Sequence, residues 1–209
     1  MTKEEKQILN DIEVLVCDFD NNVKKIKDRL RGITIDKSFG QQLLYVDVLS
    51  KSCRQRRMLL FDIMLHEPTN LNKDWEISYY LVKEAYIMTD NIYAQLKLSP
   101  YSFKLKDYLR EMQKHVNIDQ LMEQEERDYL DSLSYPMTAY RGMCNAEFKS
   151  KDYGISWCDS KEYALKYVFF SKNNNKDTDG KILSYEIDRN DIFAAWGVKG
   201  KAKELILLI

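Results

Sequence analysis

Glycine and proline are scarce in this sequence, and neither sign of charge dominates. The chain has 7 Gly and 3 Pro in 209 residues, which excludes collagen-like and low-complexity proteins and favours long helices over many short turns. Lys and Arg number 32 and Asp and Glu 33, so the net charge is -1. The basic excess typical of nucleic-acid-binding proteins is therefore missing. Hydrophobic residues make up 44%, enough for a folded core.

Targeting and membrane segments are missing as well. The N-terminal MTKEEKQILNDIE has neither the apolar stretch nor the small-residue cleavage site of a secretory signal. The longest apolar run, LILLI at 205–209, is far shorter than the roughly 18 residues of a membrane span. We therefore expect a cytoplasmic protein that has free thiols and no membrane partner.

Residues that usually mark metal or nucleotide sites are sparse. None of the four cysteines lies in a CxxC pair, and the two histidines, His66 and His115, are far apart. The P-loop, Rossmann, zincin and nucleophile-elbow motifs do not occur. The sequence predicts no metal cofactor.

The first 133 residues have a helical pattern. Apolar residues at steps of three and four predict helices over 3–31, 39–66, 73–97, 102–115 and 119–133. Gly32 follows two arginines and is expected to end the first helix. The basic run RQRR at 54–57 lies inside the second helix, where a solvated face is expected rather than a nucleic-acid site.

From residue 134 the pattern changes to short strands. They are expected at 137–143, 154–157, 181–188, 191–197 and 203–209. One helix is expected over 159–170, with Asp159 as its N-cap and with Tyr163, Tyr167 and Phe170 on one face. Antiparallel strands with segregated helices predict an α+β protein. Its helical region would cover 1–133 and its β-rich region 134–209, either as two parts or as one integrated domain.

Three strand segments carry groups suited to chemistry. Arg141 precedes Gly142, so a planar cation lies beside a position where a ligand can approach the backbone. Ser156 and Trp157 precede a helix and offer a hydroxyl and a flat ring. Glu204 follows a glycine-containing loop and can stabilise a developing cation. Taken singly, each also fits a structural role: a surface arginine, a core tryptophan or an edge charge.

The order of these segments resembles the R-S-E group of ADP-ribosyltransferases. That pattern has an Arg-Gly strand, then a Ser strand followed by a helix, then a Glu strand after a loop. Residues 135–209 follow it, from YRGM through GISWCDSKEYALKYVFF to KELILL, and are also similar to small phage and bacterial proteins. The resemblance implies a small split β-sheet with one helix, which binds NAD+ unlike the parallel dinucleotide-binding fold. It implies a mono-ADP-ribosyltransferase whose acceptor is a macromolecule, expected to be a protein.

The same resemblance implies a role for each site residue. Arg141 would contact a phosphate or the nicotinamide ribose of NAD+, and the Gly142 backbone would hold the nicotinamide amide. Trp157 would belong to the same NAD+-binding segment as Ser156. Ser156 would position Glu204, and Glu204 would bind a ribose hydroxyl and favour the oxocarbenium-like state as nicotinamide leaves. A phosphate-binding arginine and a cation-stabilising carboxylate suit a substrate with two phosphates and a cationic leaving group.

Two positions differ from the family pattern. Ala202 stands where arginine-modifying members carry a second Glu or a Gln, and Cys158 stands where Thr or Ser is usual. These differences leave other functions open. One is a catalytically degenerate module that binds a protein partner, such as a phage inhibitor or regulator. An NAD+ glycohydrolase is also open, because the same cleft could admit water instead of an acceptor. A third is a helical interaction protein whose C-terminal sheet is only structural.

Overall fold

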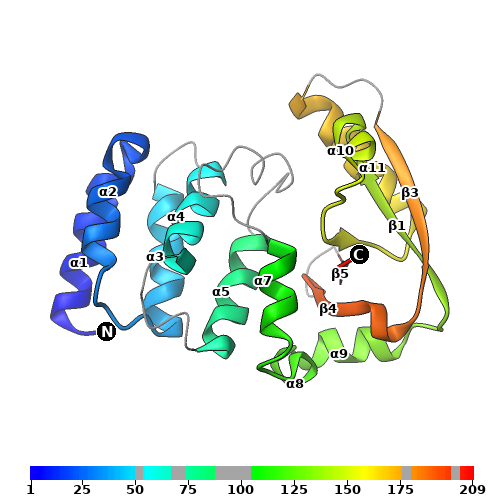
Figure 1. The fold of residues 1–209 in the computed structure, drawn as a ribbon, viewed down its shortest axis with the longest axis horizontal. Helices are drawn as coiled ribbons and strands as arrows, with labels where there is room; N and C mark the ends of the chain where they lie inside the picture. The colour runs from blue at the N-terminus through cyan, green and yellow to red at the C-terminus, as the bar shows by residue number, and fades with distance from the viewer. Residues whose placement is uncertain (50–53, 67–73, 88–104, 176–179, 199–202) are drawn as a thin grey trace. The chain divides into compact units, whose positions relative to one another are not determined.

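A computed structural model of the chain describes residues 1–209 apart from 50–53, 67–73, 88–104, 176–179 and 199–202 (Figure 1). The chain forms two compact units, Met1–Lys104 and Leu105–Ile209. The described part of the first unit is helical, whereas the second combines helices with five strands. The chain is therefore an α+β protein, as the sequence predicts.

The first unit begins with two short helices where the sequence predicts a single one. Helix α1 spans Lys3–Val16 and α2 spans Phe19–Leu30. The chain breaks at Asp18, which lies outside the helical region with φ -130° and ψ 64°. A straight helix over 3–31 could bury its apolar stripe only against a surface about 40 Å long, but the turn lets α1 and α2 pack on each other. The expected stop at Gly32 is confirmed by its positive φ of 79°.

Three further helices complete the described part of this unit. They are α3 at Lys37–Leu49, α4 at Arg54–His66 and α5 at Trp75–Ile87. Helix α3 contacts α1, α4 and α5, so it lies at the centre of the helical core. The large, fully buried side chains of the unit come from all five helices and include Ile12, Phe19, Ile26, Leu43, Phe61 and Tyr79. The predicted helical residues 50–53 and 88–97 lie outside the described residues.

The second unit begins with three short helices. Helix α7 spans Leu105–Met112, α8 spans Ile118–Leu121 and α9 spans Gln124–Asp131. The predicted helix 119–133 is therefore divided, because α8 stops at its cap Met122 and a new capping box joins Glu123 to Glu126. Both α8 and α9 contact strand β4.

In the described part of the second unit, five strands form two small antiparallel sheets. Strand β1 (Met137–Met143) pairs with β3 (Lys181–Ile187), while β2 (Ser156–Trp157), β5 (Glu204–Leu207) and β4 (Ile192–Trp196) form the other sheet in that order. All five expected strands are present, and β2 is shorter than predicted. Tyr140 and Cys158 exchange both backbone hydrogen bonds, at 2.8 and 2.9 Å. This bridge joins the two sheets.

Helix α11 (Lys161–Asn175) lies against β1 and β3 (Figure 1). Its first turn is capped by Ser160 rather than by the predicted Asp159, since the Tyr163 N–H donates to Ser160 Oγ at 3.2 Å. A second helix, α10 (Asn145–Ser150), lies between β1 and β2, where none is predicted. Its N-cap is Cys144, whose sulfur accepts from the Glu147 N–H at 3.4 Å. Cysteine is not one of the usual capping residues, so the sequence signal for this helix is weak.

The change from helices to strands occurs near residue 134, whereas the compact units divide between 104 and 105. The short helices α7–α9 therefore belong to the same unit as the strands. A division into domains at 133/134 stays a prediction. In the described residues, no helix combines the length and the apolar character that a bilayer span requires.

Candidate functional site

The register of the second sheet places Ser156 and Glu204 on one face. Ser156 of β2 lies opposite Ile206 of β5, and Glu204 lies two residues before Ile206. Because side chains alternate across a strand, residues 204 and 206 share a face, and Ser156 is a diagonal neighbour of Glu204. The intervening Leu205, opposite Trp157, points to the other face of the sheet, and both Leu205 and Ile206 are fully buried. The pairing of two short strands thus brings together two residues that are far apart in the sequence.

Ser156 lies between the other two predicted site residues. Its backbone carbonyl accepts a hydrogen bond from Nη1 of Arg141 on β1. Its side chain hydrogen-bonds to the Glu204 carboxylate, and this lowers the pKa of that group. The structure therefore brings Arg141, Ser156 and Glu204 into one cluster, at the place where β1 meets the second sheet.

The carboxyl group of Glu204 is enclosed by protein. Burial raises its pKa above the ordinary value, and three interactions oppose that rise: hydrogen bonds from Tyr167 and Ser156 and the positive charge of Arg141. The Tyr167 hydroxyl, on α11, donates to Glu204 Oε1 at 2.8 Å. A desolvated carboxylate with few donors suits a site in which positive charge develops, because little water is present to screen the attraction.

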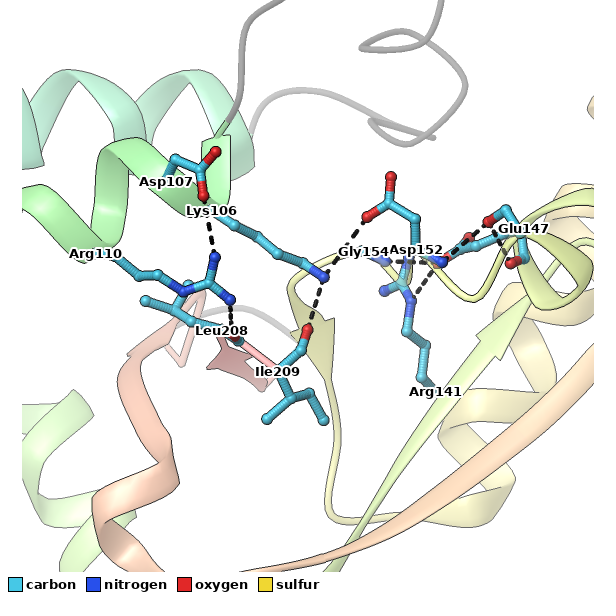
Figure 2. Close-up of polar contacts among 10 residues, drawn as sticks. Lys106, Asp107, Arg110, Arg141, Glu147, Asp152, Gly154, Leu208 and Ile209 are labelled. Atoms are coloured by element: carbon cyan, nitrogen blue, oxygen red, sulfur yellow. Dashed lines mark hydrogen bonds and ion pairs between the residues drawn. The ribbon is translucent and has the colours of Figure 1, made fainter.

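A buried carboxylate holds the Arg141 guanidinium in place (Figure 2). Arg141 Nε donates to Glu147 Oε1 at 2.7 Å, and the two side chains are only 12% and 4% exposed. The same oxygen accepts from the Gly154 N–H, also at 2.7 Å. A Cβ on Gly154 would lie 2.2 Å from Arg141 Nη2. The arginine is thus fixed between α10 and the segment that leads into β2.

Gly142 permits a close contact between β1 and α11. A Cβ at this position would lie 1.9 Å from the Ala164 carbonyl oxygen, so any side chain would push the helix away. Tyr140 directs its N–H and C=O towards Cys158, and Gly142, two residues later, directs its own groups to the same side of β1. They point away from β3. The predicted contact of these groups with a nicotinamide amide stays a prediction.

Trp157 and Cys158 lie in the core. The Trp157 residue is 1% exposed and points to the face of β2 opposite Ser156. Its predicted part in binding NAD+ stays a prediction that this burial does not favour. The Cys158 thiol donates to the carbonyls of Ser160 and Tyr140, at 3.2 and 3.4 Å, and burial raises its pKa to about 11. It is a structural thiol rather than a nucleophile.

Helix α7 brings two further cations to the segment that follows Glu204 (Figure 2). Lys106 Nζ donates to the Ile209 carbonyl at 2.7 Å, and Arg110 donates to the Leu208 carbonyl. Burial lowers the pKa of Lys106, and the charges of Arg110 and Arg141 lower it further, while Asp152 at 3.8 Å opposes them. The helix therefore anchors the chain at the end of β5.

Sequence reasoning missed two members of this cluster. Glu147 lies on the unpredicted helix α10, so no periodic pattern pointed to it. Tyr167 was predicted to share a helix face with Tyr163, but nothing in the sequence indicated that this face meets Glu204. The i, i+4 pair of tyrosines was the available signal. Ala202 lies outside the described residues, as does most of the loop before Glu204.

In the parts of the chain that the structure describes, no group of three or more His, Cys, Asp or Glu residues is arranged to hold a metal ion. Comparison with known proteins adds no assignment. No protein-family model matches the chain, and no curated protein or solved structure is significantly similar to it. The arrangement of the cluster itself is therefore the basis for a functional hypothesis.

Proposed function

We propose that the chain is an NAD+-dependent mono-ADP-ribosyltransferase that transfers ADP-ribose to a protein. The supporting observation is the position of Ser156, whose carbonyl contacts Arg141 and whose side chain contacts Glu204. These residues are the three that the resemblance singles out, and they come together through the pairing of β2 with β5 and the bridge between Tyr140 and Cys158. The split between the two sheets also agrees with the fold that the resemblance implies.

The proposed reaction uses the two charges of the cluster differently. The Arg141 cation attracts a phosphate of NAD+. Glu204 accepts a hydrogen bond from a ribose hydroxyl and stabilises positive charge on the ribose. The bond between C1′ and the nicotinamide nitrogen breaks, and its electron pair leaves with nicotinamide. An acceptor nucleophile then forms a bond to C1′ and releases its proton to solvent. If water takes the acceptor's place, the same site acts as an NAD+ glycohydrolase.

A second candidate is an inactive module that binds a protein partner. It is favoured by the state of Arg141, whose side chain is 12% exposed and whose guanidinium already contacts Glu147 and the Ser156 carbonyl. An arginine held in this way has less capacity to receive a phosphate. The two candidates differ in whether NAD+ is bound and turned over.

The deciding experiment incubates the full chain with labelled NAD+, with and without cell lysate. Glu204→Gln removes the proposed catalytic charge and keeps the size of the side chain. Glu186→Gln is the matched control, because Glu186 lies on the exposed side of β3. We expect nicotinamide release and protein labelling by the wild type and the control, with a loss of at least about 100-fold in Glu204→Gln.

Two other outcomes redirect the assignment. Nicotinamide release without labelled protein identifies a glycohydrolase. No release, together with no binding of NAD+ in calorimetry, contradicts both NAD+ reactions and leaves the partner-binding module.

A further inference from the structure

The hydrogen bond between Tyr167 and Glu204 has consequences for the state of the carboxyl group. Tyr167 lies on α11, and its hydroxyl donates to Glu204 Oε1 at 2.8 Å. A hydrogen bond is stronger when its acceptor is charged, so this contact favours the ionised form of the carboxyl group. It also occupies one of the two carboxylate oxygens and restricts the orientation of the other.

Close packing and an aromatic contact fix the position of Tyr167. The Tyr163 and Tyr167 rings are 5.5 Å apart in an edge-to-face arrangement with an interplanar angle of 74°. Lys166 lies over the Tyr163 ring at 5.2 Å. On the neighbouring face of α11, Ala164 meets Gly142 of β1 without a side chain between them. These contacts hold α11 close to β1, in a position where the Tyr167 hydroxyl can donate to Glu204.

The alternative donors to Glu204 are few. Ser156 supplies a hydrogen bond and Arg141 acts through its charge, because the guanidinium itself bonds to Glu147 and the Ser156 carbonyl. Burial favours the protonated acid at this position. The interaction with Tyr167 is the largest of those that oppose burial.

We propose that Tyr167 is a positioning residue whose hydrogen bond to Oε1 orients the Glu204 carboxylate and stabilises its ionised form for contact with a ribose hydroxyl. This inference rests on the proposed function for the ribose ligand, while the effect of Tyr167 on Glu204 is a property of the protein alone. Tyr167 acts through Glu204 and does not itself touch the reacting atoms. The cluster is then a set of four residues, in which α11 contributes a donor that the three-residue motif does not contain.

The test measures the ionisation of Glu204 without any substrate. The full chain is labelled with carbon-13 at the glutamate carboxyl groups, and the Glu204 resonance is identified by its absence from Glu204→Gln. Its chemical shift is then followed against pH in the wild type, Tyr167→Phe and Tyr185→Phe. Tyr185 is an exposed tyrosine on β3 (52% exposed) and is the matched control. We expect Tyr167→Phe to raise the Glu204 titration midpoint by about one to two pH units, and Tyr185→Phe to leave it unchanged.

A second variant acts in the opposite direction. With 3-fluorotyrosine at position 167 the hydroxyl is a stronger donor, so the Glu204 midpoint is expected to fall. This substitution keeps the ring and the hydroxyl, so it provides a test even if Tyr167→Phe does not fold. A midpoint that moves in neither variant overturns the proposal.

Nicotinamide release against pH separates this proposal from the proposed function. If the wild type is active, the acid limb of the profile should move in Tyr167→Phe by the same amount as the carbon-13 midpoint. An active enzyme whose midpoint and acid limb both stay fixed overturns the role of Tyr167 and leaves the transferase in place. If the wild type is inactive but the midpoint moves, the NAD+ reaction fails while the effect of Tyr167 on Glu204 is supported.

Discussion

Arg141 and Glu147 form a buried ion pair at the centre of the candidate site. Removing one member of a buried pair leaves the other charge uncompensated, which costs about 3–5 kcal/mol. The pair between Asp107 and Arg110, whose side chains are 63% and 45% exposed, is of the kind that contributes about 0–1 kcal/mol. The two pairs within one unit therefore allow a direct comparison.

We expect Glu147→Gln to lower the free energy of unfolding by about 3 kcal/mol, because Arg141 loses its counter-charge. Asp107→Asn should lower it by less than about 1 kcal/mol. Urea denaturation followed by circular dichroism measures both. Equal effects of the two substitutions would show that the Arg141–Glu147 pair is not desolvated as described.

Glu204 makes stability depend on pH in a direction that can be worked out. Its pKa is raised by burial, so folding favours the protonated acid. Any stabilisation from this preference is complete below the unfolded-state pKa and is lost as the pH rises through the folded-state pKa. Glutamine at position 204 carries no charge at any pH, so Glu204→Gln should gain stability relative to the wild type as the pH rises.

Unfolding by urea at a series of pH values tests this prediction. The free energy of unfolding of Glu204→Gln, relative to that of the wild type, should increase from acidic to neutral pH. The free energy of unfolding of Glu186→Gln, relative to the wild type, should not change with pH. A stability difference that is the same at every pH would mean that folding does not raise the pKa of Glu204.

At the scale of elements, the packing of α11 on β1 depends on one glycine. A Cβ at Gly142 would overlap the Ala164 carbonyl oxygen, so the helix would have to move. The helix carries Tyr167, and its displacement would lengthen the hydrogen bond to Glu204. A side chain added at Gly142 of β1 would thus weaken the hydrogen bond to Glu204 by displacing α11.

We expect Gly142→Ala to destabilise the protein by about 1–3 kcal/mol, the usual effect of overpacking a buried contact. Ser184→Ala, at the exposed position of β3 opposite Tyr140, should change stability by less than about 0.5 kcal/mol. Thermal unfolding of the two variants gives the comparison. If Gly142→Ala is as stable as the wild type, α11 is not packed as closely against Gly142 as the structure shows.

The elements differ in how well the sequence predicted them. The β3 segment has a clear period of two, and the predicted bounds of β1 and β3 agree with the structure to within a residue. The break at Asp18 and helix α10 were missed, because one depends on packing between α1 and α2 and the other on a cysteine cap. The order of Arg141, Ser156 and Glu204 was readable from the sequence. Glu147 and Tyr167 were not, since only the register and helix packing bring them to the site.

At the scale of the whole molecule, the unit Leu105–Ile209 contains every residue of the candidate site. Its first helices support the strands directly. Lys106 and Arg110 bind the carbonyls of residues 209 and 208, and the Ala195 N–H donates to the Met122 sulfur at 3.4 Å. A fragment cut at 133/134, where the sequence pattern changes from helices to strands, would lose these contacts.

We therefore expect a fragment of residues 105–209 to unfold cooperatively on heating and to give a dispersed amide NMR spectrum. A fragment of residues 134–209 should do neither, because β4 and the end of β5 lose the surfaces that cover them. If the shorter fragment folds equally well, α7–α9 are dispensable for the strands. If neither folds, the second unit depends on the first for its stability.

The buried thiol of Cys158 gives access to the motions of this site. Cys158 lies on the bridge that joins the two sheets, and its pKa is raised to about 11, so an alkylating reagent can modify it only when the bridge opens. The exposed Cys17 reacts without any opening and serves as an internal reference. The ratio of the two alkylation rates in native buffer therefore measures how often the strand of Arg141 separates from the sheet of Glu204. A ligand that contacts both Arg141 and Glu204 should slow the modification of Cys158 and leave that of Cys17 unchanged.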